Sequence, residues 1–247
     1  MSAFRFLVSP EELDGEEVRL RGAELRHLRA RRLAPGAEIV VVDGEGRERH
    51  ATVLGVGRSE AVLRFDADQT RAPRVVESPL QLTLAQAALK ADKLDFVVEK
   101  ATELGVTDIV IFTSSRCVAR PASERRRRWE RLAQSATKQC GRARVPSIRG
   151  PMSFDEFLGE QRRGLALFFW EGAPDDGRLL TTTGSQTPES VVAMVGPEGG
   201  FSLEETEAAR RAGFRIVGLG PRILRAETAA LVATTLCQSL WGDLSTR

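Results

Sequence analysis

The feature that most constrains the fold is a pair of apolar runs in the last quarter of the chain, each followed by a glycine-containing break and a helical pattern. The first run, residues 191–195, is short enough for a fully buried strand of a parallel sheet, and Gly196 and Pro197 end it. Ser202 lies three residues before Glu205, which is the capping-box spacing that opens a helix. The sequence therefore predicts a strand, a glycine turn and a helix in succession.

The same order is repeated directly afterwards. Gly213 suits the residue just past the first helix, residues 214–219 form the next strand candidate, and Gly220-Pro221 breaks it before a long helix from about 227 to 241. Two loops at the carboxyl ends of neighbouring parallel strands form a crevice, which is where open α/β sheets bind ligands. An α/β fold with a ligand site at this crevice is the expectation.

The residue types narrow the ligand. Glycines let a ligand approach the backbone, while Leu219, Ile223 and Leu224 offer apolar walls, which suits an adenine and a ribose better than a triphosphate. Neither a P-loop nor a G-x-G-x-x-G fingerprint is present in the sequence. Taken alone, residues 196–200 are equally compatible with a simple tight turn.

The two runs read "VGPEGGFSLEE" and "LGPRILRAETAA", and in this order and spacing they closely resemble the cofactor-binding end of the SPOUT methyltransferases, specifically the RsmE-type ribosomal RNA uridine N3-methyltransferases. The resemblance implies a SPOUT-type parallel sheet with a C-terminal trefoil knot, preceded by a small PUA-like β-barrel domain. It also implies S-adenosyl-L-methionine as cofactor, 16S ribosomal RNA of the small subunit as partner, and a homodimer in which one subunit's N-terminal domain presents RNA to its partner's knot.

The residues predicted to bind the cofactor lie in loops at strand ends. They are Thr113, Trp170, Glu171, Gly196, Pro197, Glu198, Gly199, Gly200, Leu219, Gly220, Ile223, Leu224, Arg225 and Thr228. For Trp170 the alternative is a place in the core.

The implied chemistry needs help at the acceptor, because uracil N3 carries a proton at neutral pH. A general base and a cation beside the carbonyl oxygens would both assist. Arg225 and Glu227 lie two residues apart on the second loop and are the predicted catalytic residues, with Arg225 either stabilising charge on a uracil oxygen or holding the target phosphate. Glu227 is equally suited to cap its own helix, and Glu198 has the same ambiguity.

Residues 1–72 are predicted to form the separate β-rich domain. Strand candidates cover residues 38–43, 47–54 and 61–65, with Asp43-Gly44 as a hairpin signal. The segment "LRHLRARRLAPGAEIVVVDGEG" resembles the PUA-like RNA-holding domain of the same family. A linker is expected at 73–79.

The methyltransferase domain is expected to cover residues 80–247, where strands and helices alternate. Strand candidates are residues 80–85, 108–112 and 165–170. Asp92 is predicted to cap a helix that Gly105 ends, and Ser123 to cap the next.

Basic residues are concentrated between Arg116 and Arg149, where eleven Lys or Arg face two Glu, a net charge of +9. Such a block is a candidate phosphate-binding surface, or a solvated helix face in an arginine-rich chain. The residues predicted to contact RNA are Arg5, His27, Arg29, Lys90, Lys93, Arg116, Arg120 and Arg142. A partly exposed helix position is an equal reading for His27.

Three unpatterned cysteines (Cys117, Cys140 and Cys237) and two histidines predict neither a disulfide framework nor a metal site, and reducing cytosol is expected. No apolar stretch has the length of a membrane span. Two rival functions remain at this stage: a ribose 2′-O methyltransferase of the same fold, and a non-catalytic RNA-binding or ribosome assembly factor.

Overall fold

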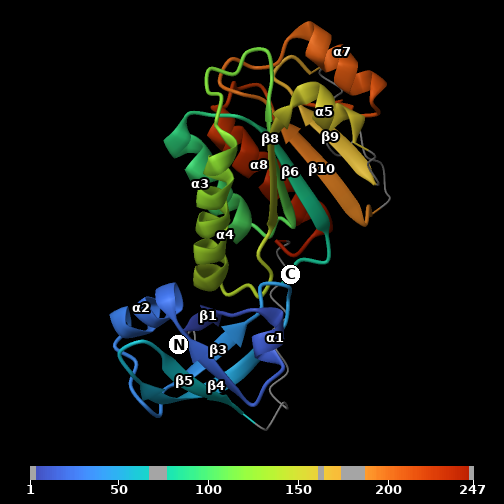
Figure 1. The fold of residues 1–247 in the computed structure, drawn as a ribbon. Coiled ribbons are helices and arrows are strands. Elements are labelled where there is room, and N and C mark those ends of the chain that lie inside the picture. The colour runs from blue at the N-terminus through green and yellow to red at the C-terminus, as the bar shows by residue number, and fades with distance from the viewer. Residues whose placement is uncertain (1–3, 67–76, 161–163, 174–186, 245–247) are drawn as a thin grey trace. The chain divides into compact units, whose positions relative to one another are not determined.

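The computed structural model describes residues 4–66, 77–160, 164–173 and 187–244 (Figure 1). The chain forms two compact units, one of Met1–Glu77 with Gln134–Val145 and one of Ser78–Ala133 with Pro146–Arg247. Most of the linker expected at 73–79 lies outside the described residues.

The first unit is built on one five-stranded sheet in the order β1-β3-β4-β5-β2. The β1–β3 pair is parallel and the other pairs are antiparallel. The strands are β1 (Arg5–Leu7), β2 (Glu17–Leu20), β3 (Glu38–Val42), β4 (Glu48–Val56) and β5 (Ala61–Phe65), and the helices are α1 (Pro10–Leu13) and α2 (Gly22–Ala30). The three longer strands were predicted. The two short edge strands were not, because three or four residues carry too little alternation to show a period.

The core of this unit lies where α2 meets the sheet. Leu28 of α2 packs in one cluster with Phe6, Ile39 and Leu63, all with no exposed surface. The predicted hairpin is present, since β3 and β4 pair antiparallel around Asp43. The carboxylate of Asp43 accepts the amides of Glu45 (2.8 Å) and Arg47 (3.0 Å), which fixes the turn.

The second unit contains a six-stranded, wholly parallel sheet in the order β11-β9-β10-β6-β7-β8. Its strands are β6 (Gln81–Ala87), β7 (Asp108–Thr113), β8 (Ser147–Ser153), β9 (Leu165–Phe169), β10 (Ser190–Val195) and β11 (Arg215–Val217). The predicted parallel α/β fold is confirmed. The trefoil knot stays a prediction.

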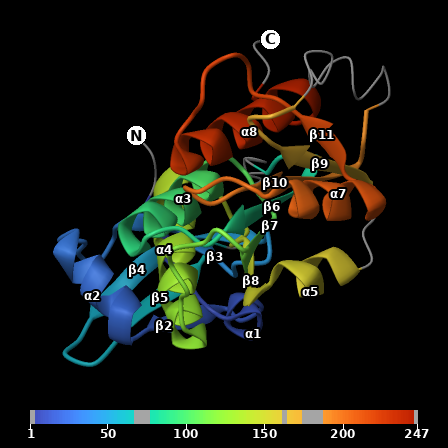
Figure 2. The ribbon, with the colours of Figure 1, turned by 90° about the horizontal axis from the view of Figure 1, so that it is seen from above.

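Helices cover both faces of this sheet. They are α3 (Ala91–Glu103), α4 (Arg126–Cys140), α5 (Phe154–Gly159), α7 (Leu203–Arg211) and α8 (Ala226–Trp241). α8 packs on β10, β6 and α3, while α5 packs on β7 and β8, and Figure 2 shows α8 and α5 on opposite faces. The C-terminal part of α4, from Gln134, belongs to the first unit by its contacts. No helix in the described part of the chain is long and apolar enough to cross a membrane.

Two predicted helix caps are wrong by one or more residues. α3 begins after Lys90, and Asp92 lies in its first turn, where its charge faces the positive helix end without capping. Ser123 begins a short 3₁₀ turn (Ser123–Arg125) that precedes α4. The Ser202–Glu205 capping box is confirmed, with reciprocal bonds of 3.1 and 2.9 Å.

Candidate active site at the carboxyl ends of the parallel strands

A cavity of about 350 Å³ lies in the second unit, at the carboxyl ends of β9 and β10 and beside the loop that leads into α8. Its walls are Lys93, Phe169, Trp170, Glu171, Val195, Gly196, Pro197, Glu198, Gly200, Leu219, Gly220, Pro221, Arg222, Ile223, Leu224, Arg225, Ala226 and Ala229. The two glycine-containing loops that the sequence placed at a crevice therefore share one cavity.

Most of the predicted cofactor residues line this cavity, and three do not. Thr113 ends β7 and donates its hydroxyl to the carbonyl of Met152 (3.4 Å). Gly199 packs against Arg116, because a Cβ at Gly199 would lie 3.0 Å from the Arg116 Cβ. Thr228 is exposed on α8. Trp170 lines the cavity, whereas the alternative expectation for it was a place in the core.

The turn after β10 is both a tight turn and a cavity wall. The amide of Gly200 donates to the carbonyl of Pro197 (3.0 Å), and Gly200 adopts a φ of +67°. This left-handed backbone conformation favours glycine, and an added Cβ would also displace the carboxylate of Glu171. Buried Gln86 donates its side-chain amide to the carbonyl of Gly196 (3.1 Å), which fixes the start of the turn.

Glu205 joins this turn to a second loop. Its buried carboxylate accepts the Ser202 amide at 2.9 Å and the Ser115 amide at 2.7 Å. Ser115 follows β7, so one side chain connects the loop after β7 with the turn after β10. The capping pattern was visible in the sequence, but the bond to Ser115 was not.

Charged groups stand on the side of the cavity nearest α3. Lys93 Nζ lies 3.2 Å from Glu227 Oε2 and 3.7 Å from Glu198 Oε1. Glu198 also accepts the backbone amide of Lys90 (3.3 Å). Lys93 and Glu198 are wall residues, whereas Glu227, one of the two predicted catalytic residues, is not.

Arg225, the other predicted catalytic residue, is exposed on the cavity wall and is the N-cap residue of α8, although its side chain caps nothing. Glu227 lies in the first turn of α8, where a carboxylate is favoured by the helix dipole. Arg222 also lines the cavity but is not among the residues predicted from the sequence. Its position between Pro221 and Ile223, inside the second motif, could have indicated that it lies at the site.

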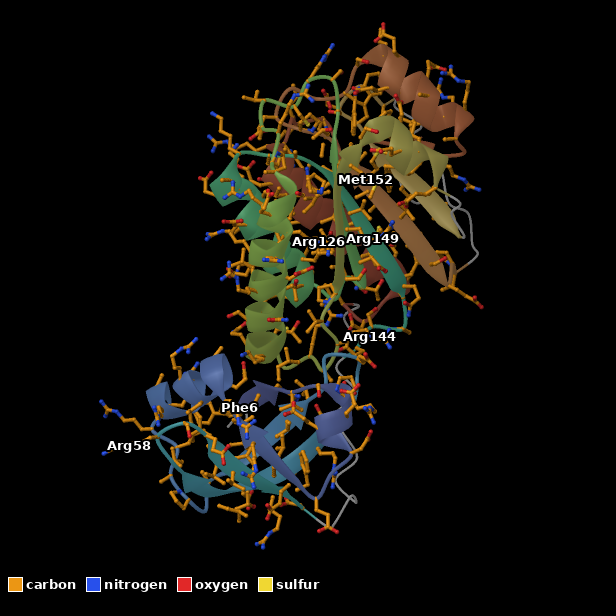
Figure 3. The ribbon with its side chains drawn as sticks, viewed as in Figure 1. Phe6, Arg58, Arg126, Arg144, Arg149 and Met152 are labelled. Atoms are coloured by element: carbon orange, nitrogen blue, oxygen red, sulfur yellow. The ribbon has the colours of Figure 1, made fainter. Side chains whose placement is uncertain are left out.

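The residues predicted to contact RNA in the first unit have protein partners. Arg5 forms an ion pair with Glu48, and Arg29 donates to the carbonyl of Arg58 (2.8 Å). The ring of His27 packs against Phe6 at a tilt of 40°, with ring centroids 5.1 Å apart; Figure 3 labels Phe6 and Arg58. Burial lowers the pKa of His27, and the charge of Lys138 lowers it further.

Arg142 departs most from its predicted role. It is 2% exposed and pairs with Glu77 at 2.9 Å, while Glu77 also accepts the amides of Ala143 and Arg144. This position gives Arg142 a structural role in the first unit. Its surface is too small for direct contact with a nucleic acid backbone.

The basic block from Arg116 to Arg149 is partly neutralised within each unit. The pairs are Arg126–Glu130, Arg128–Asp95, Lys138–Glu24, Arg142–Glu77 and Arg149–Glu160. Arg116 and Arg120 are exposed in the loop after β7, and Arg116 lies against Gly199 of the cavity turn. Arg116 also donates to the carbonyl of Gly199 (3.4 Å), so this arginine is the part of the block that lies beside the cavity turn.

The cysteines are free, and burial raises the pKa of the Cys237 thiol to about 12. In the described ranges no three His, Cys, Asp or Glu side chains converge as metal ligands.

Comparison with known families gives two matches. Residues 76–238 match the RNA methyltransferase domain, and residues 20–66 match the RNA methyltransferase PUA domain. Both matches are to RNA methyltransferases, a class in keeping with a parallel sheet that carries a cavity at its strand ends.

Individual relatives narrow the class. Proteins named ribosomal RNA small subunit methyltransferase E from Synechocystis sp. and Bacillus subtilis are 31% and 30% identical, over 96% and 87% of this chain and 78% and 86% of theirs. The chain belongs to this family of ribosomal RNA small subunit methyltransferases.

Solved structures agree with the sequence relatives. A ribosomal RNA small subunit methyltransferase E from Neisseria gonorrhoeae, bound to S-adenosyl methionine, is 33% identical with a TM-score of 0.85, and the match covers 98% of this chain and 100% of that one. A methyltransferase from Legionella pneumophila in complex with the same cofactor is 30% identical with a TM-score of 0.86, covering 99% and 100%.

Proposed function

We propose that the chain is an S-adenosyl-L-methionine-dependent methyltransferase that modifies N3 of a specific uridine in 16S ribosomal RNA of the small subunit. The observation that carries the proposal is the cavity in which both glycine-containing motifs meet at the carboxyl ends of β9 and β10. The family membership supports the ribosomal RNA substrate.

The cavity fits the cofactor. Its volume of about 350 Å³ falls within the range of ligand pockets. Phe169, Val195 and Leu224 give apolar walls for an adenine ring, and the backbones at Gly196 and Gly220 approach the cavity closely. When bound, S-adenosyl-L-methionine supplies a methyl group carried on a cationic sulfur.

The chain's own contribution to the reaction is made at the acceptor base. Uracil N3 becomes a nucleophile only when it loses its proton, and the negative charge then spreads onto the neighbouring carbonyl oxygens. Arg225 reaches the cavity wall and carries a permanent positive charge, so it stabilises charge on one of these oxygens.

The rest of the assembly follows the same proposal. Residues 1–72 serve as the PUA-like RNA-binding domain, supported by the match at 20–66, and residues 80–247 as the methyltransferase domain. Arg116 and Arg120 contact RNA phosphates beside the cavity, where the target uridine enters unpaired. The protein acts as a homodimer in the cytoplasm, where ribosomal subunits are found.

The experiment is methyl transfer to small subunits by the wild type and by Arg225→Ala, at saturating cofactor. Loss of a cation that acts on developing charge lowers kcat by about 100-fold. Cofactor affinity, measured by calorimetry, should change little. Arg211→Ala, an exposed arginine at the end of α7 and outside the cavity, is the matched control. Unchanged turnover of Arg225→Ala would remove Arg225 from the mechanism.

A further inference from the structure

Lys93 lies on α3, outside the two glycine-containing motifs, and yet its side chain forms part of the cavity wall. Its ammonium stands between two carboxylates from separate segments, Glu198 of the turn after β10 and Glu227 of the first turn of α8. The side chain is 27% exposed, against 15% for Glu227, and only Lys93 and Glu198 of the three form part of the cavity wall. The group that faces the cavity from α3 is therefore a cation, with Glu227 behind it.

The ammonium of Lys93 keeps donors for a ligand. Its distances to Glu227 and Glu198, 3.2 and 3.7 Å, are those of ion pairs, and the buried Oε2 of Glu227 takes no hydrogen bond. Throughout the part of the chain that the structure describes, no acceptor takes a hydrogen bond from Lys93 Nζ. An ammonium has three N–H donors, so even with both carboxylates paired to it one donor remains for a molecule in the cavity.

Lys100, which lies about two turns further along α3, differs from Lys93 in its hydrogen bonds. Its ammonium also stands between two carboxylates, but it donates hydrogen bonds of 2.7 Å to both Glu99 and Glu103. Lys100 is not part of the cavity wall. The same residue type on the same helix thus donates two hydrogen bonds at position 100, whereas at position 93 the ammonium forms ion pairs at longer distances.

We propose that Lys93 is a catalytic residue of the methylation, donating a hydrogen bond to a uracil carbonyl oxygen next to N3. The proposal rests on the proposed function and adds to it a second cation. N3 lies between two carbonyl groups, so its anion carries charge on two oxygens. Arg225 and Lys93, both on the cavity wall, provide one cation for each.

The reaction balances with these residues alone. The N3 proton passes to solvent water, and N3 keeps the electron pair. That pair forms the bond to the methyl carbon, while the pair of the broken carbon–sulfur bond stays on sulfur. Glu227 then acts through Lys93, as a positioning residue that holds the ammonium toward the cavity.

The test compares Lys93→Gln with Lys100→Gln as the matched control. For Lys93→Gln we expect kcat to fall by about 100-fold, as for loss of one donor to developing charge. The pH at which the rate rises should move upward, because the N3 proton is held more tightly without the cation. Glu171, Glu198, Arg222, Arg225 and Glu227 are the other charged groups around Lys93 and the cavity, and both variants retain them. Lys100→Gln should keep the wild-type rate and pH profile.

Two further measurements separate the outcomes. Calorimetry should show that Lys93→Gln binds the cofactor as the wild type does, and Lys93→Arg, which keeps the charge, should recover part of the rate. A loss of cofactor affinity with unchanged kcat would assign Lys93 to the cofactor and overturn the proposal, as would equal rates for the two Gln variants. If the wild type itself transfers no methyl group, the proposed function fails and not Lys93 alone.

Discussion

The carboxylate of Glu205 offers a prediction whose size follows from the structure. Glu205→Ala removes the acceptor of two buried or half-buried amides, Ser202 at 2.9 Å and Ser115 at 2.7 Å. A hydrogen bond to a charged group contributes about 1.5 to 3 kcal/mol, so the two together contribute about 3 to 6 kcal/mol before relaxation. We expect a loss of about 3 kcal/mol in the free energy of unfolding.

Glu156 provides the matched control. It forms the same capping box with Ser153, at 2.6 and 3.1 Å, but at an exposed helix start and, among the described residues, without a bond to a second loop. Glu156→Ala should therefore cost about 1 kcal/mol, the usual value of a cap. The difference between the variants, about 2 kcal/mol, measures the bond from Ser115 and the burial of the carboxylate.

Equilibrium urea unfolding followed by tryptophan fluorescence is the assay. The three tryptophans, Trp129, Trp170 and Trp241, all belong to the second unit, so the signal reports the unit that contains both glutamates. The urea slope should be the same for both variants, so that midpoints translate into free energies. If Glu205→Ala is no more destabilising than Glu156→Ala, the connection between the two loops contributes nothing.

Two predictions concern the first unit. Asp43→Ala should destabilise this unit by about 3 kcal/mol at pH 7, measured by amide hydrogen exchange in β3 and β4. The variant loses two hydrogen bonds from backbone amides and the ion pair with Arg47. Burial alone would raise the pKa of Asp43, but the amides of Glu45 and Arg47 and the Arg47 charge lower it overall, so the difference from wild type should shrink as the pH falls below the ordinary value of 3.8. Burial lowers the pKa of His27, so the unfolded state binds the extra proton and thermal stability should fall as the pH drops below 6.5. His27→Gln should remove that part of the pH dependence, and an unchanged acid profile in the variant would contradict the assignment.

The sequence was informative where local pattern decides structure. The apolar run at residues 191–195 became β10, and the Ser202–Glu205 spacing became a capping box. β8 escaped notice because Gly150 and Pro151 interrupt its apolar pattern. The strand expected at 214–219 is shorter, Arg215–Val217, and Leu219 already belongs to the cavity wall.

Contacts between segments that are distant in the chain could not be predicted from the sequence. Lys90 and Glu198 are 108 residues apart in the chain, and only the parallel sheet brings α3 beside the turn after β10. For the same reason the local density of basic residues predicted Arg142 as an RNA contact, although Arg142 is buried and forms an ion pair with Glu77. Local charge density does not tell which carboxylate folds back onto a given arginine.

The identity of the methylated nucleoside is the most direct test of the proposed function. Small ribosomal subunits and naked 16S ribosomal RNA, each lacking the modification, are incubated with the protein and labelled S-adenosyl-L-methionine, and the digested nucleosides are resolved by mass spectrometry. We predict one labelled product, 3-methyluridine, formed by the wild type and reduced about 100-fold by Lys93→Gln. A 2′-O-methylated nucleoside, or cofactor binding with no transfer to either RNA substrate, would contradict the proposal.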